Sequence, residues 1–561
     1  MHDFAIRNAS ICDGSGAPAY VGELAVTDGR ISEVGPKVGP ARENVDAGGQ
    51  TLSPGIIDNH THYDAQITWD PYASPTLGLG VTTLIMGNCG FTIAPCRPAD
   101  REQTLKNLTQ VEGMSLDALL EGTRSDYESF ADYVDMVSSL GVVPNVAVYC
   151  GHSSVRTWVM GEDAVKRTAT DSEVGQMKSI IREALNDGAI GFATSTFEGH
   201  NGWGGTPMPS RFADLAEMDA LVGTLGEVGA GTFMLTKGNP TPVPYLATLA
   251  EKTGRPVAVA AITYDHFKPE RAFADMRAIG EAVDRGHRMM GQVACTAISM
   301  DFSLRSAYLF EALGAWRPAI ALYDDLDGLR SFCRSKDFRS AMRKELRDPE
   351  ALNRFTDQWD KVEILGVAKA DNRHLEGRMV GELAAQADKD PLDWILDFAD
   401  SEDFATMFNA QILNADEDEV VKLLKDSNTT IGLADAGAHL FLFCDADFGL
   451  HLLGHWVRER GDFTLEEAVA ELTSKQADAY GIRQRGRLQA GHFADLLMFD
   501  PATVGRGKKE RVFDLPAGAA RLVRQGTGVS GIWVNGVRVA DESGVIKNGA
   551  RPGQVLREFD A

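Results

Sequence analysis

Two histidines separated by one residue stand at the end of an apolar run, and they are the clearest sign of chemistry in this chain. His60 and His62 close a segment that begins at Thr51 and is interrupted by Pro54 and Gly55. Residues i and i+2 of an extended strand face the same side, so the two imidazoles point toward one place. The Pro-Gly pair is expected where a chain enters a buried strand. The spacing therefore predicts a site for a divalent metal.

Two more residues extend this predicted site. Cys89 lies in the segment 80–90 just past an apolar run, and a thiolate beside two imidazoles suits zinc. Asp435, in the segment 431–439, lies where a carboxylate would touch both the metal and its water. A metal lowers the pKa of bound water from about 15.7 toward about 7, and a carboxylate can pass the released proton to a leaving group. This pair predicts hydrolysis. The alternatives are a buried apolar cysteine and an aspartate that caps a helix.

Three further side chains are candidates for substrate binding. His152 and His439 follow apolar runs and are predicted to bind substrate oxygens, with buried, fully hydrogen-bonded histidines as the alternative. Arg211 is a candidate clamp for a substrate carboxylate, because guanidinium binds carboxylate with two parallel hydrogen bonds. A solvated surface arginine is the alternative for Arg211.

The middle of the chain alternates apolar, strand-like runs with helical patterns, which favours a parallel sheet with crossover helices. Eight such strands close a barrel whose carboxyl ends converge on one site. We therefore predict the α/β class and a metal-dependent (β/α)8 TIM-like barrel. The predicted strands end near His62, Gly87, Gly151, Ser195, Thr236, Ile262, Ala294 and Ala434.

The two ends of the chain differ from the middle, because short strands separated by turns fill both. We predict a small β-sandwich built from residues 1–53 and 484–561, rather than two unrelated β-rich tails. The barrel is then assigned to 54–299 and 429–483. Residues 300–428 form a charged, mostly helical stretch between strands seven and eight. Insertions on that face of a barrel commonly cover the active site, so this stretch is predicted to be a lid.

Composition limits the partners. The net charge of −25 argues against nucleic acid and against an anionic membrane surface, and it leaves a small molecule as the expected substrate. No apolar stretch is long enough to cross a bilayer and the first residues lack a signal peptide, so a cytoplasmic location is predicted. The seven cysteines have no framework spacing and are predicted to be reduced. The oligomeric state stays open, a homo-oligomer included.

Four segments together resemble the amidohydrolase superfamily and, within it, the N-acyl-D-amino-acid deacylase (D-aminoacylase) family. They are residues 54–62, 80–90, 435–439 and 486–500. The resemblance covers nearly the whole chain and is weakest over 300–428. It implies a site with one or two zinc ions in which Cys89 joins the two histidines as a ligand. It also implies that Asp435 contacts the metal and serves as the acid/base residue.

The chain departs from this family at the fifth strand. The family carries metal-binding histidines after strands five and six, whereas Lys237 stands at the end of the fifth strand here. Either Lys237 is carboxylated and becomes an anionic metal ligand, or it binds substrate and leaves a changed or single-metal site. After strand six, His266 is the predicted source of the missing imidazole, and Asp265 competes with it.

The sequence thus predicts a metal-dependent hydrolase that cleaves the amide bond of an N-acyl amino acid or a related small amide. A second hypothesis keeps the same site but takes a cyclic amide, a lactone or a carbamate as substrate. A third, from another class, is a non-catalytic protein that binds a small molecule on a degenerate barrel.

Overall fold

The computed structural model describes residues 1–348, 355, 357–440 and 445–560. The chain divides into two compact units, which are described separately. The first unit holds Met1–Ile262, Ala274–Cys295 and Val421–Ala561. The second unit holds Thr263–Phe273 and Thr296–Val420.

An eight-stranded parallel sheet forms the centre of the first unit and confirms the predicted barrel class. Its first three strands are buried along their whole length, as expected where helices cover a parallel sheet. The eight predicted strand ends agree with the observed ones to within about two residues. In sheet order the strands are β6 (Ile56–Thr61), β7 (Val81–Met86), β8 (Asn145–Gly151), β9 (Gly191–Ser195), β10 (Thr232–Thr236), β11 (Val257–Ile262), β12 (Met289–Ala294) and β16 (Thr429–Gly432).

The first and last strands of this sheet approach each other beyond their regular ladders. Thr61 forms a parallel bridge with Ala436, and the His62 backbone N–H donates to the Ala436 carbonyl at 2.8 Å. On the same side, the Leu433 N–H donates to the Asn59 side-chain oxygen at 3.3 Å. The barrel is thus nearly closed, and closure brings the segment after β16 beside the end of β6.

Crossover helices between the strands begin at strong local signals. Three helices, α3 (Phe130–Leu140), α5 (Asp171–Asn186) and α15 (Leu465–Leu472), begin with an N-cap Ser or Thr. The side chain of this residue accepts from the backbone N–H of an acidic residue three positions later, and the acidic side chain accepts from the backbone N–H of the N-cap. Such capping boxes place the helix start in the sequence itself. The helices of the first unit include α1 (Arg101–Val111), α2 (Leu116–Gly122), α3 (Phe130–Leu140), α4 (His152–Met160), α5 (Asp171–Asn186), α6 (Leu215–Val228), α7 (Val243–Thr253), α14 (Phe448–His451), α15 (Leu465–Leu472) and α16 (Ser474–Tyr480).

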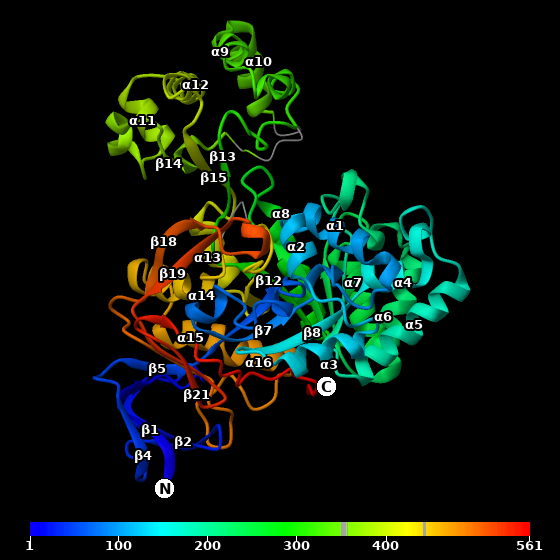
Figure 1. The fold of residues 1–561 in the computed structure, drawn as a ribbon, viewed down its shortest axis with the longest axis vertical. Helices are drawn as coiled ribbons and strands as arrows, with labels where there is room; N and C mark the ends of the chain where they lie inside the picture. The colour runs from blue at the N-terminus through cyan, green and yellow to red at the C-terminus, as the bar shows by residue number, and fades with distance from the viewer. Residues whose placement is uncertain (349–354, 356, 441–444, 561) are drawn as a thin grey trace. The chain divides into compact units, whose positions relative to one another are not determined.

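Both ends of the chain contribute to a nine-stranded sheet, as Figure 1 shows in blue and red. Strand β5 pairs with β17 from the other end, so the termini are joined by a ladder. The pairing makes one sheet, whereas the sequence predicted a sandwich of two. Three strand spacings separate β1 from β20, which would be about 14 Å in a flat sheet. The ring centroids of Phe4 on β1 and Trp533 on β20 are nevertheless only 6.3 Å apart. The sheet therefore curls around its own core. Its strands are β1 (His2–Ile11), β2 (Tyr20–Thr27), β3 (Arg30–Gly35), β4 (Ala41–Asp46), β5 (Thr51–Pro54), β17 (Leu496–Phe499), β20 (Val529–Val534), β21 (Val537–Asp541) and β22 (Gly544–Val545).

A two-stranded ribbon, β18 (Gly505–Val512) and β19 (Arg521–Thr527), also belongs to the first unit. It is tied to the segment that follows β16, because the Leu522 N–H donates to the Leu440 carbonyl at 2.8 Å. Arg506 adds ion pairs with Asp445 and Asp447 at 2.9 and 2.8 Å. The ribbon thereby contacts Leu440, Asp445 and Asp447.

The second unit has its own hydrophobic core and a three-stranded antiparallel sheet. The sequence predicted a helical insertion over 300–428, and the sheet was missed. The unit also draws on Thr263–Phe273, which precedes β12 in the chain. The predicted role as a lid stays a prediction. The elements are β13 (Ile298–Phe302), β14 (Val362–Gly366) and β15 (Met407–Leu413) with α9 (Leu326–Arg334), α10 (Lys336–Leu346), α11 (Val380–Gln386) and α12 (Pro391–Ser401), while α8 (Glu270–Asp284) and α13 (Glu417–Leu424) run from one unit into the other.

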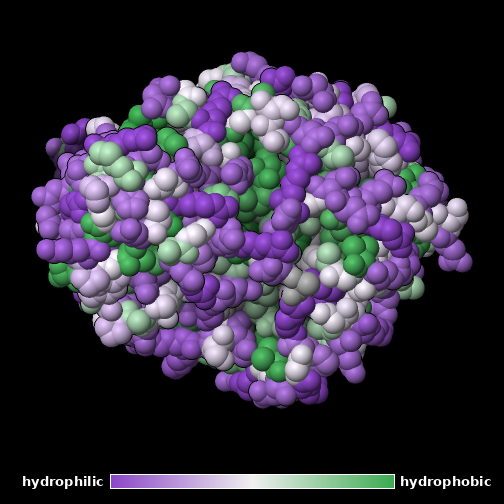
Figure 2. Space-filling model, turned by 90° about the horizontal axis from the view of Figure 1, so that it is seen from below, coloured by the Kyte–Doolittle hydropathy of each residue, from purple (hydrophilic) through white to green (hydrophobic). Residues whose placement is uncertain are grey.

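The face of the molecule shown in Figure 2 is mainly hydrophilic, with hydrophobic residues in small scattered groups. Among the described residues, no helix combines the length and the apolar character that a membrane span requires. The cytoplasmic location stays a prediction. Six cysteines are free and buried, as the sequence predicted for reduced thiols, and Cys444 lies outside the described residues.

Candidate active site

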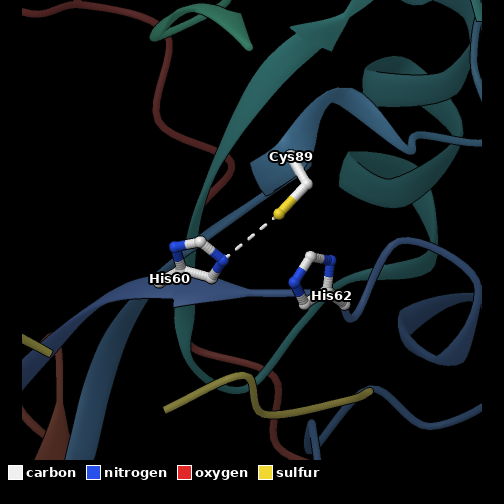
Figure 3. A group of neighbouring side chains, drawn as sticks. All are labelled: His60, His62 and Cys89. Atoms are coloured by element: carbon white, nitrogen blue, oxygen red, sulfur yellow. Dashed lines mark hydrogen bonds between the residues drawn. The ribbon is translucent and has the colours of Figure 1, made fainter. Parts of the chain in front are cut away.

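Four of the predicted side chains meet at the carboxyl ends of the barrel strands. One ligand atom from each of His60, His62 and Cys89 lies within 4.8 Å of the other two, and all three residues are buried. Figure 3 shows the rings of His60, on β6, and His62, directly after it, beside the Cys89 thiol from the turn after β7. Asp435 joins them, because its Oδ1 lies 3.2 Å from the Nε2 of both histidines. The predicted convergence of these four side chains is present in the structure.

The other ring nitrogen of each histidine lies close to a buried side chain, and this contact has hydrogen-bond geometry for His60 but not for His62. His60 Nδ1 lies 2.7 Å from the side-chain oxygen of Gln292, which projects inward from β12. His62 Nδ1 lies 3.1 Å from Oε1 of Glu112, the residue that ends α1. Partners of this kind fix the orientation of a ligating imidazole and its tautomer. They leave Nε2 of both rings directed at the same point, beside Asp435.

Three of the site residues have left-handed backbone conformations. Cys89, Asp435 and His439 have φ angles of 57°, 49° and 52°. Such conformations are uncommon outside glycine and collect at functional sites. Gly437 allows the segment to pass close to β6, because a Cβ there would lie 2.8 Å from the His62 carbonyl carbon. The turns after β7 and β16 are thus shaped to aim side chains at the histidines.

Burial sets the protonation of the group. Burial alone would raise the pKa of Asp435, but hydrogen bonds and charge from His60 and His62 outweigh it and hold that pKa well below its usual range. Burial lowers the pKa of His62, which favours the neutral, ligating ring. Burial, with the charges of Glu112 and Asp435, holds the pKa of the Cys89 thiol well above its usual range. A cation is therefore needed to make Cys89 a thiolate.

The donor set fits zinc. Two neutral imidazoles, a thiol and a carboxylate at one buried point are the ligand types that zinc prefers. Gln292 on His60 Nδ1 satisfies the second requirement of such a site, and Glu112 lies 3.1 Å from His62 Nδ1. His60, His62 and Cys89 are thus the residues that would hold the metal, with Asp435 in contact.

The end of the fifth barrel strand corrects the prediction for Lys237. Its ammonium lies 2.9 Å from Asp275 on α8. Successive residues of a strand face opposite sides, and the preceding residue, Thr236, faces the site. The Thr236 hydroxyl oxygen is 3.0 Å from the Cys89 sulfur. At the end of β10 the side chain that faces the site is therefore the Thr236 hydroxyl and not the predicted Lys237 ammonium.

His266 and Asp265 belong to the second unit. The His266 side chain is exposed and its ring contacts Phe267. The backbone N–H of Phe267 donates to Asp265 at 2.9 Å. Within the described ranges, the three-residue group that could hold a metal does not include His266. The proposed ligand role of His266, with Asp265 as its competitor, stays a prediction.

The predicted substrate-binding role of His152 is not supported, because both of its ring nitrogens already have protein partners. Nδ1 lies 2.7 Å from the Thr194 hydroxyl and Nε2 lies 2.9 Å from Oε1 of Glu217. Arg156 donates to the same carboxylate oxygen at 2.8 Å. All four side chains are buried. This group, here termed the His152 network, joins β9, α4 and α6.

Arg211 and His439 have different surroundings. The Arg211 guanidinium donates to the His200 carbonyl at 3.2 Å and to the Asn201 side-chain oxygen at 2.6 Å, so it holds a loop rather than standing free as a carboxylate clamp. The His439 backbone N–H donates to the Glu112 carbonyl at 2.5 Å. The charge of its ring also lowers the pKa of His62. His439 thus lies at the site, and its contact with substrate stays a prediction.

Sequence reasoning missed Glu112, Gln292 and Thr236. Gln292 carried a usable signal, because it is an amide inside the otherwise apolar strand β12. Glu112 carried none, since an acidic residue at a helix end is usually solvated and only the fold brings it to His62. Thr236 required the register of the strand, which differs by one residue from the assignment to Lys237.

Comparisons with known proteins agree with this geometry. The sequence profile described as the amidohydrolase family matches residues 43–540. A D-aminoacylase of Alcaligenes xylosoxydans xylosoxydans is 29% identical, over 99% of this chain and 97% of its own length. An N-acyl-D-aspartate deacylase of the same organism is 28% identical, over 100% and 96%. An N-acyl-D-glutamate deacylase from Bordetella bronchiseptica, solved with zinc and a phosphonate inhibitor, shares the fold with a TM-score of 0.66 at 24% identity, over 99% of this chain and 100% of its own.

Proposed function

The chain belongs to the amidohydrolase family, and from that premise we propose that it is a metal-dependent hydrolase that cleaves the amide bond of N-acyl-D-amino acids. The observation that carries the proposal is the convergence of His60, His62, Cys89 and Asp435 on one point. Relatives that align over nearly the whole chain are named for hydrolysis of this bond in D-amino-acid derivatives. The two alternatives are hydrolysis of a cyclic amide, lactone or carbamate and non-catalytic binding of a small molecule, and the substrate panel below distinguishes them.

The proposed metal is zinc. It would supply a Lewis acid that polarises the amide carbonyl and lowers the pKa of water. His60, His62 and Cys89 would hold it, with Gln292 hydrogen-bonded to the ring of His60 and Glu112 beside the ring of His62. The related N-acyl-D-glutamate deacylase was solved with zinc, which supports this choice.

Asp435 is proposed to move the proton. Its low pKa keeps the carboxylate ionised at neutral pH, so it can accept a proton from the attacking water. As the water oxygen bonds to the carbonyl carbon and the C–N bond breaks, Asp435 returns that proton to the leaving nitrogen. The products are a carboxylic acid and a free amine.

We also propose a single metal ion per site. At the end of β10 the residue that faces the group is Thr236, whose neutral hydroxyl is a weaker ligand than imidazole. Carboxylation of Lys237 is disfavoured by its neighbour, because a carbamate would place a negative charge beside Asp275 instead of the present ion pair.

A substrate panel tests the function. Zinc-loaded protein is given N-acyl-D-amino acids, their L-enantiomers, and cyclic amides, lactones and carbamates of similar size, with chelator-treated protein as the control. We expect hydrolysis of the N-acyl-D-amino acids that chelation abolishes and zinc restores. Preferred turnover of a cyclic compound would support the second hypothesis. Binding without turnover of any compound would support the binding protein.

A further inference from the structure

We infer that His200 contacts the substrate, donating a hydrogen bond from Nε2 to the acyl oxygen, and that Phe91 and Phe197 form the walls of a subsite for an apolar acyl group. The inference rests on the proposed amide hydrolysis. His200 was not among the candidates from the sequence, because it lies in a loop without a recognisable motif.

The ring of His200 lies next to the segment that carries Cys89. His200 follows β9, and its ring centroid is 5.0 Å from that of Phe91, two residues after Cys89. Gly90 brings the two segments together, because a Cβ there would lie 2.3 Å from the Ala193 carbonyl oxygen. The loop that carries the thiol is thus packed directly on the strand that leads to His200.

The electrostatic surroundings of the ring are consistent with this position beside the group of His60, His62, Cys89 and Asp435. His439, Asp435, His62 and His60 all act electrostatically on His200. Burial is the largest influence, and together these effects lower the pKa of His200 to about 3. The imidazole is therefore neutral at physiological pH, and it offers an N–H donor without acting as a proton source.

The contacts of Ser195 make Nε2 the hydrogen-bond donor of the His200 ring. Ser195 is fully buried, and its hydroxyl oxygen accepts from the Phe197 N–H at 3.2 Å. The same hydroxyl lies 2.7 Å from Nδ1 of His200. The buried hydroxyl proton needs an acceptor, and Nδ1 supplies it, so the ring proton is on Nε2. No residue in the described part of the chain forms a hydrogen bond with Nε2.

Hydrogen bonds from neighbouring segments hold the loop of His200 in place. The Met208 N–H and the Arg211 guanidinium both donate to the His200 carbonyl at 3.2 Å. The Trp203 N–H donates to Asn107 on α1 at 3.1 Å. A donor held this firmly loses little entropy when substrate binds. Arg211 thus contributes by holding the loop of His200.

Two aromatic rings beside His200 indicate which group of the substrate lies next to the acyl oxygen. The rings of Phe91 and Phe197 meet the imidazole edge-on, with centroids 5.0 and 5.1 Å away. Phe197 keeps 39% of its surface exposed, which leaves it free to contact a ligand. A neutral donor between two aromatic rings suits a carbonyl that bears an apolar chain, and it is poorly suited to a carboxylate.

The experiment compares His200→Phe, which keeps a ring but removes the donor, with His200→Gln, which keeps an N–H donor. Zinc content, kcat and KM are measured for N-formyl-, N-acetyl- and N-butanoyl-D-leucine. We expect His200→Phe to lose about 10- to 100-fold in kcat/KM at unchanged zinc content, and His200→Gln to recover most of it. Phe197→Ala should reduce the preference for the butanoyl over the formyl substrate by about tenfold. Unchanged kcat/KM in His200→Phe, or unchanged acyl preference in Phe197→Ala, overturns the inference.

A binding measurement separates failure of this inference from failure of the proposed function. Calorimetry with N-butanoyl-D-leucine and zinc-depleted protein reports the contact without turnover. If zinc-loaded wild-type protein hydrolyses no amide but His200→Phe still weakens binding about tenfold, the function is wrong and the contact stands. Equal binding by both proteins, or no binding by either, overturns the inference.

Discussion

The barrel contains two buried polar groups that are built around histidine and are opposite in design. Around His60 and His62, each ring has one nitrogen beside a buried side chain, and its other nitrogen faces Asp435, with Cys89 also close to His60. In the His152 network both nitrogens are taken, by Thr194 and by Glu217. The first group is incomplete without a cation, whereas in the second both nitrogens of His152 have partners within the protein.

The difference teaches how to separate a ligating histidine from a structural one. Burial does not separate them, because His60 and His152 are both almost fully buried. The nature of the neighbours does. A neutralising arginine, Arg156, pairs with Glu217 in the His152 network, whereas in the described part of the chain no arginine or lysine forms an ion pair with His60, His62, Cys89 or Asp435. Variants of the His60 and His62 group should therefore change turnover or zinc binding, whereas variants of the His152 network should change stability.

The largest effect is expected at Asp435. Replacing it with asparagine keeps the shape of the side chain but removes the base, so turnover of the best N-acyl-D-amino acid should fall by about 10²- to 10⁴-fold. The variant should fold normally and retain most of its zinc, as circular dichroism and metal analysis will show. A folded Asp435→Asn protein with full turnover would contradict the proposed proton transfer.

In the His152 network the expected effect is on stability. Glu217→Ala leaves Arg156 buried without its partner and should lower the free energy of unfolding by about 3 to 5 kcal/mol. Zinc affinity of the folded fraction should stay at the wild-type level. Chemical denaturation and zinc titration measure the two effects, and a selective loss of zinc would show that the two groups are not separate.

The same carboxylate makes a prediction about acid. Burial alone would raise the pKa of Glu217, but His152 and Arg156 outweigh it and lower that pKa from 4.5 to about 2. The folded state thus binds this proton more weakly than the unfolded state, so the stabilisation is complete above pH 4.5 and is lost as the pH falls toward 2. Glu217→Gln should flatten unfolding free energy over this interval. An unchanged slope would contradict the assignment.

A smaller effect is expected at Glu112, the partner of His62. Glu112→Ala should weaken zinc binding by about 10- to 100-fold, because the ring loses its orienting contact. Glu112→Gln keeps an acceptor oxygen at the same place and should lie closer to wild type. Competition with a zinc chelator measures both. Equal affinities for all three proteins would remove Glu112 from the account.

The smallest effect is expected at Lys237. Lys237→Met breaks a partly buried ion pair with Asp275 and should cost about 1 kcal/mol of stability or less, with zinc content unchanged. Intact-mass measurement of wild-type protein in bicarbonate should show no carbamate. Loss of zinc in the variant would restore Lys237 as a ligand.

The sequence predicted the barrel well because buried parallel strands are written as continuous apolar runs, and it predicted His60, His62, Cys89 and Asp435 because they directly follow such runs. It failed at Lys237 because a shift of one residue along a strand reverses the side that a residue faces. Glu112 could not be predicted, since its role depends on where α1 ends in space. His152 was misjudged because its partners come from two other elements.

Zinc K-edge X-ray absorption of the wild-type protein tests the central claim most directly, with Cys89→Ser as the variant and the buried Cys96→Ser as its control. The account predicts bound zinc with a sulfur neighbour at about 2.3 Å and nitrogen neighbours at about 2.0 Å, and loss of the sulfur signal in Cys89→Ser alone. Protein that excludes zinc, or a spectrum that Cys89→Ser leaves unchanged, would contradict it.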